Sequence, residues 1–176
     1  ASELQPEDVD PDFVARAQVT YLEGYLFDRE AAGEAFKKAA IAGERADRLV
    51  ALTLSDSFCV ERFLDAFRGL VAETVDVLFG NEEDLTAALG YDVAGVDGAF
   101  SSLDPAAYAA TMEKVVDNFP NVAVIATSLR VVRSATVNDW GGVCFAGGRR
   151  VGATLREGLE VLDRVGGGDS IASVLV

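Results

Sequence analysis

The regular alternation of short apolar runs with longer amphipathic stretches limits this chain to few folds. Residues 49–54 (LVALTL), 75–79 (VDVLF) and 121–127 (NVAVIAT) are rich in β-branched and large apolar residues. Such runs are typical of strands that a parallel sheet buries on both faces. The stretches between them carry apolar residues at helical spacing, as crossover helices require. The pattern therefore predicts an α/β fold with a mostly parallel sheet and helices on both faces.

The remaining segments of the first two thirds extend this pattern. We expect another strand at residues 18–26, and helices at roughly 29–43 and from 104 to about 118. A helix after residue 57 is indicated by an apolar stripe that consists of Val60, Phe63, Leu64, Phe67 and Leu70. A further helix is expected to open at residues 80–85 and to run through Leu89.

The last third of the chain has a different character. Residues 134–154 alternate short β runs with the turn residues Asn138-Asp139 and Gly147-Gly148, which predicts one or two antiparallel hairpins. An apolar run that consists of Leu159, Val161 and Leu162 predicts a short buried strand. Three glycines and a final apolar helix follow it.

Composition excludes several classes of function. At 176 residues the chain is expected to form one domain, and its net charge of −14 argues against binding to nucleic acid or to anionic membranes. The absence of histidine excludes Ser-His-Asp catalysis and histidine zinc sites. No run reaches the ~18 apolar residues of a membrane span, so we expect a soluble cytoplasmic protein. Cys59 and Cys144 have apolar neighbours and are expected to be reduced core residues.

Polar residues come at the ends of several expected strands. Asp56, Asn81, Thr127 and the segment 166–169 each lie at or just after the end of an apolar run. Ligands of open α/β sheets bind outside the carboxyl ends of the strands. We therefore expect these residues to meet at one edge of the sheet.

The glycine run Gly166-Gly167-Gly168, followed by Asp169, is the strongest single motif. Glycines at the start of a helix let a ligand approach the backbone, and the first N–H groups of the helix favour an anion such as phosphate. An aspartate in such a cradle is suited to take a proton from an attacking hydroxyl. The alternative is a flexible turn with Asp169 as the N-cap of the helix.

Two further positions have both a structural and a functional interpretation. Asn81 could be an N-cap, or it could organise Mg²⁺ and its waters together with Asp84, one turn later. Arg130 could be a surface charge, or its guanidinium could pair with a nucleotide phosphate. No P-loop or Rossmann glycine motif occurs in the sequence.

Asp163 together with residues 166–169 resembles the signature Asp-x-x-Gly-(Ala/Gly)-Gly-Asp of the ribokinase (PfkB) family of carbohydrate kinases. Asn81 and Asp84 are similar to the family's Asn-x-x-Glu motif, with Asp84 at the Glu position. The resemblance implies a ribokinase-like three-layer sandwich with a mostly parallel sheet and a short antiparallel hairpin region. It also implies transfer of the γ-phosphoryl group of ATP, with Mg²⁺, to a sugar hydroxyl. The resemblance implies catalysis by Asp169 with Gly166, Gly167 and Gly168, and substrate binding by Asp56 and Asp169. It implies nucleotide binding by Asn81, Thr127, Arg130 and Asp163. It implies Mg²⁺ binding by Asn81 and Asp84.

The acceptor is not resolved by the resemblance. Residues 81–90 and 119–140 look like 2-keto-3-deoxygluconate kinases, whereas residues 21–25 and 52–60 look more like adenosine-kinase-like sugar kinases. Residues 1–176 are expected to be a single ribokinase-like domain without the family's N-terminal lid and C-terminal tail. A catalytically silent fragment is the alternative, and the uncovered apolar surface leads us to expect a homodimer.

Overall fold

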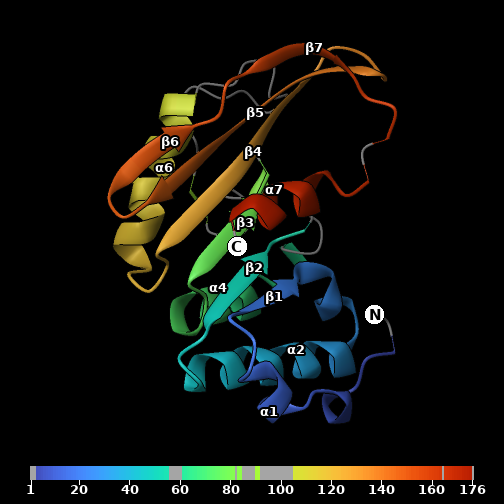
Figure 1. Ribbon diagram of the computed structural model, residues 1–176, viewed down its shortest axis with the longest axis vertical. Helices are drawn as coiled ribbons and strands as arrows, with labels where there is room; N and C mark the ends of the chain where they lie inside the picture. The colour runs from blue at the N-terminus through green and yellow to red at the C-terminus, as the bar shows by residue number, and fades with distance from the viewer. Residues whose placement is uncertain are drawn as a thin grey trace.

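A mixed sheet of seven strands forms the centre of the protein, as seen in the computed structural model (Figure 1). The structure describes residues 3–55, 61–81, 83–84, 90–91, 105–163 and 165–175. The first four strands are parallel and adjacent in chain order: β1 (Val19–Glu23), β2 (Leu49–Thr53), β3 (Val77–Gly80) and β4 (Val124–Val132). Their carboxyl ends therefore lie along one edge of the sheet, as the apolar runs predict.

The sheet turns antiparallel at its fifth strand. β5 (Val137–Ala146) pairs with β4 along its whole length, from Val124↔Ala146 to Val132↔Asn138. The other side of β5 pairs with two short strands in turn, β6 (Arg149–Gly152) at one end and β7 (Arg156–Glu160) at the other. The predicted antiparallel region is confirmed, and Gly147 and Gly148 form its turn with positive φ values of 55° and 72°.

Two details of the expected antiparallel region are wrong. Asn138 and Asp139 are not turn residues but lie in β5, where both are buried. The strand expected around Leu159 exists as β7, yet all of its residues are exposed, and Leu162 beyond it is fully exposed. The physical reason is that β7 lies at the outer edge of β5, where only one side of the strand is paired.

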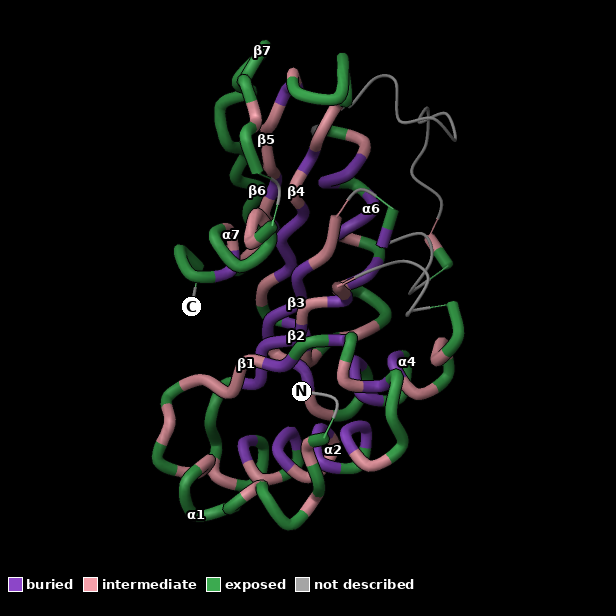
Figure 2. Tube along the Cα trace, turned by 90° about the vertical axis from the view of Figure 1, so that its right-hand side faces the viewer, coloured by how far each residue is buried: buried purple, intermediate pink, exposed green. Residues whose placement is uncertain are grey.

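Helices lie on both faces of the sheet. The described helical segments are η1 (Pro6–Asp8), α1 (Pro11–Val14), η2 (Gly24–Asp28), α2 (Glu30–Arg45), α4 (Leu64–Glu73), α6 (Pro105–Asn118) and α7 (Gly167–Leu175). Figure 2 shows α4 and α6 on one side of the strands and α7 on the other. The expected α/β fold with helices on both faces is therefore confirmed.

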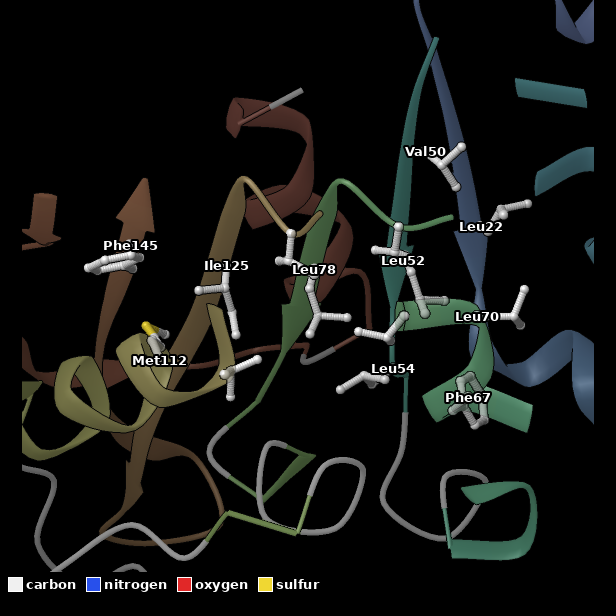
Figure 3. Close-up of a cluster of buried hydrophobic side chains, with 14 of the residues drawn as sticks. Leu22, Val50, Leu52, Leu54, Phe67, Leu70, Leu78, Met112, Ile125 and Phe145 are labelled. Atoms are coloured by element: carbon white, nitrogen blue, oxygen red, sulfur yellow. The ribbon is translucent and has the colours of Figure 1, made fainter. Parts of the chain in front are cut away.

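Most of the core lies on the α4 and α6 side of the sheet. Alternate residues of the strands, among them Leu52, Leu78 and Ile125, pack there against Phe67 of α4 and Met112 of α6 (Figure 3). A smaller cluster on the opposite face joins Ala172 of α7 to four strand residues, Ala51, Val77, Phe79 and Ala126. Alternate side chains of the strands thus point to two different faces. One face is covered by the main core, and among the described helices only α7 covers the other.

Several boundaries differ from those expected from the sequence. The first strand ends at Glu23 because Gly24 begins a 3₁₀ turn, and the fourth runs from Val124 to Val132 because β5 continues its ladder. The helix expected after residue 57 is described as α4 from Leu64. The helix expected up to Leu89, the loop after it, Asp56 and Cys59 fall wholly or mostly outside the described residues.

Cys144 is a free cysteine. Within the described part, no helix is long and apolar enough to cross a membrane.

Candidate functional site

A cavity of about 390 Å³ lies where the carboxyl ends of β2 and β3 meet the first turn of α7. Thr53 and Ser55 line it from the end of β2, and Gly80 and Asn81 line it from the end of β3. β4 and β5 close it on the other side with Ser128, Arg130 and Trp140. The cavity is therefore at the sheet edge where the sequence predicts a ligand site.

The glycine run forms the start of α7, as expected. Gly166 has a φ of 78°, a left-handed value that favours glycine, and its carbonyl accepts a hydrogen bond of 2.9 Å from Ser170 N. Gly167 and Gly168 line the cavity, and a Cβ on Gly167 would lie 3.4 Å from the Trp140 ring. The first backbone N–H groups of a helix have no intrahelical acceptor. They are therefore available as donors to an anion beside the cavity.

Asp169 lies in the first turn of α7 and is exposed. The interpretation of Asp169 as the N-cap is wrong, because the helix begins at Gly167 and Gly166 precedes it. Asp169 itself does not line the cavity, although the neighbouring Gly168 does, and its negative charge acts on Tyr21 of β1. Burial is the largest cause of the raised pKa of Tyr21, and the charge of Asp169 is the next. Tyr21 is not among the site residues expected from the sequence, where it belongs only to the stretch 21–25 that looks like adenosine-kinase-like sugar kinases.

Asn81 and Asp84 form a reciprocal capping box. Asn81 Oδ1 accepts from Glu83 N at 2.8 Å and from Asp84 N at 3.0 Å, while Asp84 Oδ2 accepts from Asn81 N at 2.8 Å. The structural interpretation of Asn81 as an N-cap is therefore confirmed. Asp84 is 2% exposed, so its carboxylate is held firmly in this loop.

These residues also supply oxygen ligands to the cavity, which Asn81, Glu83 and Asp84 all line. Amide and carboxylate oxygens that keep some water between themselves and the ion fit Mg²⁺. No group of three or more acidic, cysteine or histidine residues that could hold a metal occurs in the described ranges. The amide and carboxylate oxygens of Asn81, Glu83 and Asp84 fit a mainly water-mediated Mg²⁺ site, and the metal role stays a prediction.

Arg130 supplies positive charge to the cavity. Arg130 and Trp140 face each other in the β4–β5 ladder, and the guanidinium carbon lies 5.8 Å from the centre of the Trp140 ring. This cation–π contact helps to orient the guanidinium of Arg130, which lines the cavity. Among the described residues Arg130 has no ion-pair partner within 4.0 Å. Its charge can therefore act on an anion bound beside Gly167 and Gly168.

Three residues of the expected site are placed elsewhere or not described. Thr127 does not end a strand, since β4 continues to Val132, and strand alternation turns its buried side chain to the face opposite Ala126 and Ser128. Asp163 is exposed and does not line the cavity; its carboxylate accepts from Val165 N at 3.0 Å and shapes the turn before Gly166. Asp56 lies outside the described residues.

Comparison with solved structures gives clear relatives. The 2-dehydro-3-deoxygluconokinase of Thermotoga maritima matches 99% of this chain at 28% identity, with a TM-score of 0.81. The adenosine kinase of Sinorhizobium meliloti matches 98% at 32% identity, with a TM-score of 0.67. A probable sugar kinase of Rhizobium etli matches 98% at 31% identity, with a TM-score of 0.72.

The chain spans about half the length of these proteins, namely 52%, 46% and 45% of the three solved chains in the same order. No family model matches the sequence, and no curated protein matches it. The similarity to the three solved structures, in fold and in sequence, extends over nearly all of this chain.

Proposed function

The chain belongs to the ribokinase (PfkB) family of carbohydrate kinases by fold and by motif, and from that premise we propose that it acts in ATP-dependent phosphoryl transfer to a hydroxyl group. The proposed acceptor is a sugar or a sugar acid. The observation that carries the proposal is one cavity of about 390 Å³ that brings together the glycine N–H groups of α7 and the guanidinium of Arg130, with Asp169 directly after the glycines in the first turn of α7.

The phosphate donor fits the β4 side of this cavity. Arg130 can hold phosphate oxygens with its guanidinium, and the N–H groups at Gly167 and Gly168 can stabilise the negative charge that develops on the transferred group. Phosphoryl transfer depends mostly on such positioning and electrostatics. A ribokinase of Escherichia coli with this fold, 16% identical and with a TM-score of 0.60, was solved with ATP and Mg²⁺. ATP is therefore our proposed donor.

Asp169 is the proposed general base. It is exposed at the first turn of α7, so an acceptor hydroxyl can reach it, and its place beside the glycine N–H groups brings that hydroxyl close to the transferred phosphate. Taking the proton makes the hydroxyl oxygen a better nucleophile. Mg²⁺, which Asn81 and Asp84 would hold through water, would supply neutralisation of phosphate charge. Arg130 and the glycine N–H groups would bind the phosphates, and Asp169 would take the proton of the acceptor hydroxyl.

The acceptor could be a sugar acid like 2-keto-3-deoxygluconate or the ribose of a nucleoside. The first follows from the similarity to the Thermotoga maritima enzyme, and the second from the 32% identity to an adenosine kinase. Because the chain spans about half of either protein, the alternative that it binds ligands without turnover is kept. The nucleotide-binding role of Thr127 and Asp163 and the substrate role of Asp56 remain predictions.

The test of the proposed function is an ATP-dependent phosphorylation assay with a panel of sugars, sugar acids and nucleosides. We expect Asp169→Asn to fold normally and to lose turnover by ~10²–10⁴-fold, the usual contribution of a general base. Asp117→Asn is the matched control, because it makes the same change at an exposed site on α6, on the other face of the sheet. Equal rates in the two variants would refute the role of Asp169.

We further propose that the chain forms a homodimer in the cytoplasm, where ATP and Mg²⁺ are available. Apolar side chains are exposed on β6 and β7 and at the end of α7, and with the intervening sheet they line an apolar groove of about 520 Å³. The outer edges of β6 and β7 have no strand partner among the described residues. A second copy of the chain would cover both features.

A further inference from the structure

Trp140 contacts both halves of the candidate site. Its ring faces Arg130 across the β4–β5 ladder, with the guanidinium carbon 5.8 Å from the ring centre. The outer edge of the same ring lies against the start of α7, since a Cβ on Gly167 would be 3.4 Å from both Cζ2 and Cη2 of the indole. The indole, which lines the cavity, therefore bridges the cation and the glycine segment.

The start of α7 has few other contacts to hold it. Ala172 alone is buried among the described residues of this helix, and β7, which precedes the glycines, is exposed along its whole length. The backbone at Gly167 lies so close to the indole that there is room for a methyl group and little more. The position of the first N–H groups of α7 thus depends on the ring of Trp140.

The direction of the Trp140 side chain is itself fixed by a local irregularity of the sheet. The register of β5 with β7 shifts between Asn138 and Trp140. The residue between them, Asp139, is 3% exposed, and its Oδ1 accepts from Arg133 Nε at 2.7 Å and from Gly158 N at 2.8 Å. Register shifts such as β-bulges re-aim side chains and are common beside active sites. The ion pair and the backbone hydrogen bond therefore hold the segment that presents Trp140 to the cavity.

Resting on the kinase function proposed above, we propose that Trp140 is a positioning residue for the phosphate donor. Its ring carries no charge to offer a phosphate. It instead restricts the two groups that bind one, the guanidinium of Arg130 and the backbone at Gly167. Without the ring, the anion would have to order both groups as it binds, and ordering of a free side chain lowers affinity. Sites whose binding groups are held in place before the ligand arrives bind more tightly.

The test measures binding of inorganic pyrophosphate, with Mg²⁺ present, and requires no turnover. Trp140 is the single tryptophan of the chain, so we expect pyrophosphate to change the tryptophan fluorescence of the wild type. By calorimetry, Trp140→Leu should bind pyrophosphate ~3–10-fold more weakly, the cost of ordering one long side chain. Trp140→Phe keeps a ring opposite Arg130 but lacks the outer edge that contacts Gly167, and its affinity should be intermediate.

A double-mutant cycle separates positioning from a general effect on the fold. Arg130→Gln should weaken binding by ~10–100-fold, as loss of a charge-assisted hydrogen bond does. In that background Trp140→Leu should cost only ~2-fold, because the guanidinium that the ring holds is gone. A purely structural role of Trp140 would instead lower affinity equally with and without Arg130.

Phe13→Leu is the matched control. Phe13 makes a comparable contact with Arg16, whose guanidinium carbon is 5.3 Å from the ring centre, on α1 at the opposite end of the molecule from β5 (Figure 1). Removing this ring should leave pyrophosphate affinity unaltered. Hydrogen exchange tests the second contact of the indole: pyrophosphate should slow exchange of the α7 amides in the wild type, and less so in Trp140→Leu.

The outcomes distinguish this inference from the proposed function. Absence of pyrophosphate binding by the wild type, full affinity in Trp140→Leu, or equal effects of Trp140→Leu in the two backgrounds would overturn the positioning role. A chain that binds pyrophosphate with the expected coupling but phosphorylates no acceptor would support the role of Trp140 and refute the kinase activity of this chain. A chain that phosphorylates an acceptor equally well with leucine in place of Trp140 would keep the kinase and overturn the inference.

Discussion

Gly24 is the position where a single methyl group should do the most harm outside the candidate site. It follows β1 directly, and its backbone lies against the residue that follows β2. A Cβ built on Gly24 would be 2.6 Å from the carbonyl oxygen of Leu54 and 3.1 Å from the ring of Phe67. Real Cβ atoms essentially never come so close to a backbone oxygen, so Gly24→Ala forces part of the structure to move.

The size of the effect follows from what would have to move. Leu54 N donates to Phe79 O at 3.0 Å, and the Leu54 side chain is fully buried, so the carbonyl cannot shift without disturbing the β2–β3 contact. Overpacking of this kind costs about 1–3 kcal/mol of the free energy of unfolding. Gly69→Ala is the matched control, because Gly69 lies inside α4 and a Cβ there meets nothing within 4 Å. Replacing a helical glycine by alanine stabilises by up to ~1 kcal/mol.

Urea denaturation followed by circular dichroism measures both variants. With a slope of about 2 kcal/mol per molar urea, the midpoint should fall by roughly 0.5–1.5 M in Gly24→Ala and rise by up to about 0.5 M in Gly69→Ala. Opposite shifts from the same chemical change would show that the close approach to Leu54 is responsible. A midpoint for Gly24→Ala equal to that of the wild type, or a shift of both variants in one direction, would refute the reasoning.

Three further predictions concern the metal, pH and assembly. ATP binding measured by calorimetry is expected to need Mg²⁺, and equal affinity in EDTA would remove the metal role of Asn81 and Asp84. The pKa of Asp139 is lowered mainly by Arg133, and also by Gly158 N–H, from its ordinary value of 3.8. The stabilisation from this carboxylate is therefore complete above pH ~4 and is lost as pH falls through the lowered pKa. The difference in unfolding free energy between wild type and Asp139→Asn should thus shrink in acid. A difference that stays constant with pH would contradict a stabilising role of the ionised Asp139 carboxylate. Light scattering at micromolar concentration should show a dimer, whereas a monomer of 18.6 kDa would contradict the proposed assembly.

The parallel part of the fold could be predicted because burial on both faces leaves a strong pattern. The runs at residues 49–54 and 75–79 were readable as strands since almost every position is apolar. The end of β4 could not be predicted in the same way. Beyond Thr127 it continues through Ser128 and Arg130, whose side chains face the cavity and give a polar signal typical of a loop. Only pairing with β5, which is a long-range contact, keeps these residues in a strand.

The candidate site was predictable where the backbone makes it and less so where side chains from distant strands complete it. The glycine run could be recognised in the sequence as a special backbone segment, because Gly166 adopts a left-handed conformation that favours glycine. Asp163 matches a motif position yet serves the turn before that glycine. Tyr21 lies near α7 because β1 and α7, nearly the whole chain apart in sequence, pack on the same small cluster that contains Ala172. No local pattern in the sequence carries that information.

The two halves of the candidate site differ in how firmly they are attached to the protein. Arg130 and the Asn81 loop belong to strands that the main core anchors, whereas the glycine run is preceded by β7, whose residues are all exposed, and followed by α7, which buries only Ala172. Segments with little buried surface open locally without global unfolding. Amide hydrogens of β7 and α7 should therefore exchange with solvent much faster than those of β2 to β4. A ligand that bridges the two halves would slow that exchange, so binding and local folding of the glycine segment are one coupled equilibrium.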